Sequence, residues 1–60
     1  MGAAELVSRL QRQLARVERE EREMRRAGIY GAELLLKRVD AVELQRKIGQ
    51  ATIFARDEAA

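Results

Sequence analysis

Apolar residues recur every three or four positions along the first half of the chain, which is the period of an α-helix. The stretch 3–27 consists largely of Leu, Ala, Glu, Arg and Gln, all strong helix formers, and it contains no proline. At 100° per residue its apolar side chains fall within a sector of about 100°. We therefore predict an amphipathic helix over about 3–27. Its single narrow stripe comprises Leu6, Val7, Leu10, Leu14, Val17 and Met24.

Glu21 interrupts this stripe at a position where an apolar side chain is expected. A carboxylate there lies either near a fraying helix end or beside a basic side chain of another helix, because an unpaired charge is costly to bury. The outer face carries oppositely charged residues four apart, among them Arg16–Glu20 and Glu21–Arg25. Each such pair stabilises a helix by about 0.2–0.5 kcal/mol.

The second half, from about 32 to 56, carries two apolar seams instead of one. Together they cover roughly two-thirds of a helix circumference, so one partner helix with a narrow stripe covers only one of them. We therefore expect another chain to cover the second seam. A mid-helix glycine costs about 1 kcal/mol relative to alanine, and close approach of a neighbouring helix would explain Gly49 there. The first seam comprises Leu34, Ala41, Leu44, Ile48, Ala51 and Ala55, and the second comprises Leu35, Val39, Val42, Gly49 and Ile53.

The stretch 25–33 separates the two patterns and contains two of the four glycines. Gly28 suits the left-handed residue that follows many helices, Ile29 the hydrophobic position after it, and Gly31 the N-cap of a new helix. These signals predict a turn over about 28–31. The alternative is one helix of nearly 60 residues in a coiled coil. Against it, the apolar face shifts between the halves, and no single heptad frame runs through the break.

The fold predicted is thus all-α: a two-helix antiparallel hairpin, one domain over 1–60, completed by association with another chain. The turn residues Ile29 and Tyr30 are expected to close one end of its core. Residues 35, 39, 42, 49 and 53 are predicted to form the partner interface. The predicted intramolecular core comprises Leu6, Leu10, Leu14, Val17, Met24, Leu34, Leu44 and Ile48.

Length and composition give an independent reason for association. A domain of 60 residues buries only about 60% of the surface that its unfolded chain exposes, so small domains usually need a disulfide, a metal or a partner. The chain has no cysteine and no histidine. Association is therefore the remaining source of stability, and no metal or other cofactor is expected.

Catalytic residues are not found in the sequence. Ser8 is the only serine and Thr52 the only threonine, and the chain has no histidine to activate either hydroxyl as a nucleophile. The carboxylates alternate with arginines, which is typical of a solvated ion-pair face. We predict that the protein is not an enzyme.

Binding of RNA or DNA is the alternative function. Ten of the twelve basic residues are arginines, and the net charge is +2. Arg9, Arg12, Arg16 and Arg19 form a basic stripe that could contact phosphates. The single tyrosine and single phenylalanine offer few stacking platforms, and the glutamates between 18 and 23 cancel much of the field. A membrane role is not expected, and without a signal peptide or an apolar run of membrane length the expected location is cytoplasmic.

The layout resembles the small helical-hairpin co-chaperones of type III secretion needle subunits. The resemblance lies in "LQRQLARVEREEREMRR" (10–26), the glycine-containing turn 28–31, and "DAVELQRKIGQATIF" (40–54) within a more apolar second helix. It implies an apolar helix face, around Val39, Val42 and Ile53, that docks on a helical partner. The function predicted is a non-enzymatic protein–protein interaction module. It is either a small homo-oligomeric bundle or an adaptor or chaperone for a larger helical protein.

Overall fold

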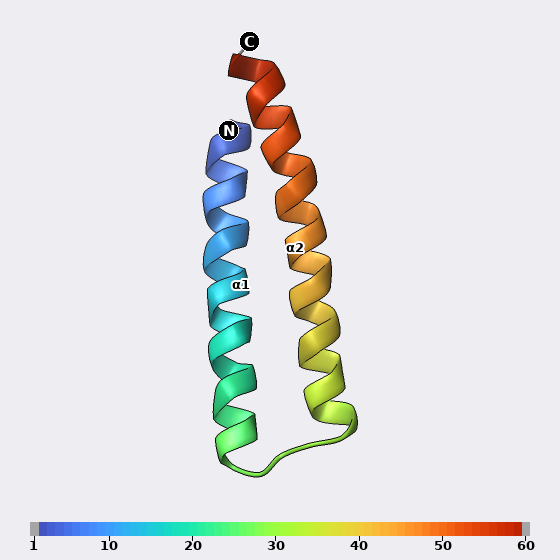
Figure 1. Ribbon diagram of the computed structural model, residues 1–60. Helices are drawn as coiled ribbons and strands as arrows, with labels where there is room; N and C mark the ends of the chain where they lie inside the picture. The colour runs from blue at the N-terminus through green and yellow to red at the C-terminus, as the bar shows by residue number, and fades with distance from the viewer. Residues whose placement is uncertain (1, 60) are drawn as a thin grey trace.

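The computed structural model describes residues 2–59 and shows two helices packed side by side. Helix α1 spans Ala3–Arg26 and helix α2 spans Ala32–Ala59. They run antiparallel, so that the start of α1 and the end of α2 lie at the same end of the molecule, opposite the turn (Figure 1). The predicted all-α hairpin is confirmed, and the alternative of a single long helix is wrong.

Helix α2 continues three residues beyond the predicted end at about 56. The segment after Arg56 contains alanine and glutamate, which favour helix, and it has neither glycine nor proline to end one. The shorter boundary rested on expected fraying of the last residues. The start of α2 at Ala32 and the end of α1 at Arg26 lie within one residue of the prediction.

The turn is built on the two glycines that the sequence singled out. Gly28 has a φ of +76°, and its N–H donates to the carbonyl of Arg25, while the N–H of Ile29 donates to that of Met24. These two bonds form a Schellman motif, which satisfies carbonyls left without partners at the helix end. Gly31 precedes α2 and accepts from the N–H of Leu35 at 3.0 Å. Its φ of +97° lies where side-chain-bearing residues are rarely found.

Ile29 and Tyr30 do not close the end of the core as expected. Tyr30 is 67% exposed and Ile29 is 38% exposed. The Tyr30 hydroxyl instead donates to the carbonyl of Arg25 at 3.4 Å, which gives the C-terminus of α1 a further hydrogen bond. The turn is therefore held by main-chain geometry and capping rather than by hydrophobic packing.

The core between the helices is small. Its buried residues are two leucines, Leu10 and Leu34, and two alanines, Ala41 and Ala51, and no large side chain among the described residues is fully buried. Leu6, also predicted to lie in the core, is 42% exposed, because it sits near the open end where the helices have no further layer above them. The other predicted core residues are half-buried: Leu14, Val17, Met24, Leu44 and Ile48.

Candidate protein interface

The side of α2 that faces away from α1 exposes large apolar side chains. Leu35 is 59% exposed, Val39 49%, Val42 56% and Ile53 60%, and Gly49 lies exposed among them. These are the five residues of the second seam. The structure leaves all of them available on one helix, without an intramolecular partner layer.

A shallow groove of about 340 Å³ runs along this face. Three apolar residues, Leu35, Val39 and Val42, line it together with three charged residues. The charged residues are Arg38, Glu43 and Arg46. Apolar contacts flanked by charges are typical of helix–helix interfaces, in which the flanking charges select the partner and its orientation.

The three charged residues at the groove differ in whether they already have partners. The guanidinium of Arg38 lies 3.7 Å from Glu21 of α1. Glu43 and Arg46 make no ion pair with any other residue of 2–57. The groove therefore offers one anion and one cation that the hairpin itself does not use. These two residues were not predicted from the sequence, although Arg46 lies on the same line of three- and four-residue steps as the seam, and Glu43 lies next to Val42.

Glu21 stands in the apolar stripe of α1 and lies beside a basic side chain of α2, Arg38. Its carboxylate is only 14% exposed, and it accepts a hydrogen bond of 2.7 Å from Arg25 while lying near Arg38 of α2. Of the two alternatives for Glu21, a fraying helix end or a basic side chain of another helix, the second is confirmed. Glu21 thus holds α1 against α2 and is not part of a free site.

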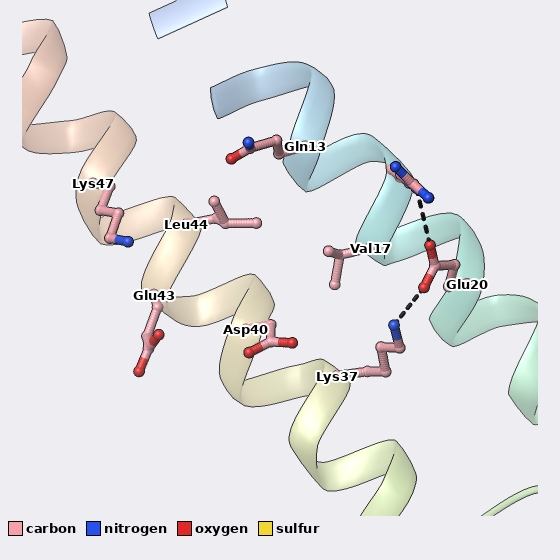
Figure 2. A pocket seen from close by; sticks show the side chains of 9 residues that line it. Gln13, Val17, Glu20, Lys37, Asp40, Glu43, Leu44 and Lys47 are labelled. Atoms are coloured by element: carbon pink, nitrogen blue, oxygen red, sulfur yellow. Dashed lines mark hydrogen bonds and ion pairs between the residues drawn. The ribbon is translucent and has the colours of Figure 1, made fainter. Parts of the chain in front are cut away.

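A second interhelical link lies beside a polar cleft of about 360 Å³ (Figure 2). The Lys37 ammonium donates to the carboxylate of Glu20, which also accepts from Arg16 at 3.2 Å. The hydrogen bond from Lys37, together with its positive charge, holds the pKa of Glu20 below its ordinary value of 4.5. Asp40, Glu43 and Lys47 also line the cleft and carry charges of both signs, so Glu43 borders both this cleft and the apolar groove. The Lys37–Glu20 contact links the two helices.

The four arginines proposed for nucleic-acid contact are all exposed on α1. They do not converge with the apolar face of α2. One of them, Arg16, is already paired with Glu20. The other three are Arg9, Arg12 and Arg19.

A second apolar patch lies at the open end of the hairpin. A groove of about 360 Å³ is lined there by Leu6, Leu10, Ala51 and Phe54, with two polar residues. Phe54 is 65% exposed. This patch lies on a different side of α2 from the second seam, roughly 100° around the helix at 100° per residue.

Within residues 2–59, neither helix is apolar enough over a sufficient length to cross a bilayer. The described residues also contain no group of three or more His, Cys, Asp or Glu side chains placed to hold a metal ion. Comparison of the chain with protein-family models, with curated proteins and with solved structures gives no significant match.

Proposed function

We propose that this protein is a non-enzymatic protein–protein interaction module, which docks on a helical partner through the second seam of α2. The observation that supports this most directly is the exposure of four large apolar side chains along one face of a single helix. Exposed apolar patches of this kind, bordered by polar residues, mark interaction sites in soluble proteins. Their straight line along α2 matches the shape of another helix.

The total surface supports the same proposal. The chain exposes 4821 Å², whereas a monomeric protein of 6.8 kDa is expected to expose about 3,950 Å². The excess, about 870 Å², is close to the roughly 800 Å² that each partner contributes to an interface of standard size. One further helical interface would bring the hairpin to the compactness of an ordinary domain.

The shape supports it as well. The radius of gyration is 14.0 Å and the molecule measures 47 × 14 × 13 Å. A compact domain of 60 residues has a radius of gyration of about 10.4 Å. A hairpin this slender lacks the second layer against which a helical domain normally buries its apolar faces.

The binding partner is a protein, either the chain itself or a larger helical protein for which it acts as an adaptor or chaperone. Nucleic-acid binding is the weaker alternative, because the exposed arginines lie on α1 and Arg16 is partly neutralised by Glu20. Retention on RNA or DNA that weakens steeply with salt and is lost in Arg12→Glu would favour that alternative.

Site-specific photo-crosslinking in the cells that express the protein tests the proposal. A photoreactive amino acid at Val42 should yield a covalent adduct with a protein chain, because this position lies in the middle of the seam. The same amino acid at Gln11, which is exposed on α1, is the matched control and should yield much less. Equal yields at both positions, or none at either, would contradict the proposal.

A further inference from the structure

We infer that the partner on the second seam is a second copy of this chain, with the two α2 helices packed antiparallel. This inference rests on the proposed function and names the occupant of the same face. It follows from three features of α2: the spacing of the seam, the charged residues that line its groove and the position of its glycine.

The spacing along the outward face is that of a coiled coil. Starting at Leu35, steps of four and three residues lead in turn through positions 39, 42, 46, 49, 53 and 56. This is the alternation of the a and d positions in a heptad repeat, and it runs almost the whole length of α2. The seam lies roughly 150° around the helix from the one that packs on α1, at 100° per residue. Two copies joined through it would place both α2 helices in the middle and the two α1 helices outside.

The unused charges at the groove are complementary to themselves. Glu43 and Arg46 both line the groove, and neither has an ion-pair partner within residues 2–57. In an interface with two-fold symmetry, residue i of one copy meets residue j of the other, and j meets i. A second copy therefore supplies a carboxylate for each Arg46 and a guanidinium for each Glu43.

One antiparallel register satisfies these conditions together. If the two-fold axis passes at the level of position 44, Leu35 lies opposite Ile53 of the second copy. Val39 then lies opposite Gly49, and Val42 opposite Arg46. Each Arg46 is within one residue rise, about 1.5 Å along the axis, of Glu43 in the other copy. All five apolar members of the seam are covered.

A parallel arrangement is less favourable for the same residues. It would place Arg46 against Arg46 and Gly49 against Gly49 in the same layers of the seam. Like charges placed opposite each other disfavour association, and two facing glycines leave a gap. The glycine is better matched in the antiparallel register, where it faces Val39. A Cβ at Gly49 would meet no atom within 4 Å in the single hairpin, so any close approach at this position has to come from another chain.

Charge reversal with sedimentation equilibrium tests the second copy. The unmodified chain should sediment as a dimer at micromolar concentration. Glu43→Arg alone and Arg46→Glu alone should each weaken association about tenfold, because each creates two like-charge contacts per dimer. An equimolar mixture of the two variants should form a heterodimer at least as tight as the unmodified dimer, since one variant is then basic where the other is acidic. Circular dichroism checks that each variant remains helical.

Engineered cysteines test the orientation, since the natural chain has none. In the antiparallel register, positions 35 of the two copies are roughly 27 Å apart along the axis. Leu35→Cys or Ile53→Cys alone should therefore give no intermolecular disulfide on mild oxidation. A mixture of the two variants should give a mixed disulfide. Disulfides between identical variants would overturn the antiparallel register.

The outcomes separate this inference from the proposed function. A chain that stays monomeric at all concentrations, yet crosslinks from position 42 to a different protein, overturns the second copy and leaves the interaction module intact. If the dimer dissociation constant is unchanged by the charge reversals and by Val42→Lys, both are overturned, because the interface then lies elsewhere. A dimer restored in the mixture of charge variants supports both.

Discussion

The two apolar faces of α2 differ in how far the hairpin buries them. Toward α1, Leu34, Ala41 and Ala51 are buried, at 8%, 8% and 4% exposure. Away from α1, Leu35, Val42 and Ile53 are each more than half exposed. In a domain that is complete as a monomer, large apolar side chains of this kind are expected inside.

This difference indicates how the stability of the molecule is divided. Burying a Val, Leu or Ile side chain contributes about 1.5–3 kcal/mol, whereas a single methyl group contributes less than about 1 kcal/mol. The alanines toward α1 allow the helices to approach closely but contribute little apolar surface, so that face depends mainly on its larger residues, Leu34 among them. The outward face holds side chains of comparable size outside, so we expect its burial in an interface to add to the stability of the hairpin.

The largest effect expected is the difference in stability between alanine variants of two adjacent leucines, Leu34 and Leu35. Leu34→Ala removes a buried side chain from the face toward α1 and should destabilise the hairpin by about 2–3 kcal/mol. Leu35→Ala, at 59% exposure, should change the free energy of unfolding of the monomer by less than about 0.5 kcal/mol. Urea unfolding followed by circular dichroism, below the dissociation constant of the dimer, measures both.

Repeating this measurement above the dissociation constant extends the comparison. Leu35→Ala should then also lower stability, because the seam is buried in the dimer. Leu34→Ala should lower the free energy of unfolding by about the same amount at both concentrations. If Leu35→Ala remained silent at high concentration, the outward face would not be an interface.

The next largest effect is the difference in dimerisation between a positive and a negative charge introduced at Val42, at the centre of the outward face. Val42→Lys places an ammonium beside Arg46 of the second copy and should weaken dimerisation about 100-fold, or roughly 2.7 kcal/mol. Val42→Glu places a carboxylate beside the same guanidinium and should weaken it only about tenfold. Sedimentation equilibrium gives both constants, and Gln11→Lys on α1 is the control for added charge. A greater loss for glutamate than for lysine would contradict the register.

Gly49 and Gly31 should respond to alanine in opposite directions. Gly49 lies in the middle of α2, so Gly49→Ala should stabilise the monomeric hairpin by about 1 kcal/mol. Gly31 has a φ of +97°, so Gly31→Ala should destabilise it by about 1–2 kcal/mol. Thermal unfolding at low concentration gives both values. In the dimer, Gly49→Ala should weaken association severalfold, because its methyl group meets Val39 of the second copy.

An unchanged dimerisation constant for Gly49→Ala would show that the helices do not approach closely at this level. The hairpin itself cannot produce a weakening, because a Cβ at position 49 has no neighbour within 4 Å there. Gly31 lies outside the seam, so Gly31→Ala should alter dimerisation only through loss of folded protein. Comparison of Gly49→Ala with Gly31→Ala thus distinguishes an effect on the stability of the hairpin from an effect on dimerisation.

Most of the fold could be predicted from local patterns in the sequence. Gly28, Ile29 and Gly31 predicted the turn because helix termination depends on main-chain geometry within a few residues. The apolar period predicted which side of each helix packs inward. The end of α2 was missed because no residue after Arg56 marks a stop, and Leu6 was placed in the core because periodicity does not indicate where the helices run out of partners.

The charged features of the site were less predictable. The interhelical partner of Glu21 was expected as a type of residue, but its identity as Arg38 depends on the relative rotation and height of the two helices. The link between Glu20 and Lys37 depends on the same two quantities. Glu43 and Arg46 stand out only after the structure shows which other charges are already paired.

The smallest effect expected concerns the polar link on the side of α2 toward α1, and it depends on pH. Because Lys37 holds the pKa of Glu20 below its ordinary value of 4.5, the unfolded chain binds a proton more readily than the folded chain as the pH falls. The contribution of Glu20 to stability is therefore present above about pH 4.5 and is lost as the pH falls through its folded-state pKa. Glu20→Gln should lower stability slightly at neutral pH and flatten the decline in acid, as measured by thermal unfolding across this range. Glu18→Gln, an exposed change on the same helix, is the control. If both variants gave the same pH profile, the Lys37–Glu20 contact would not contribute to holding α1 against α2.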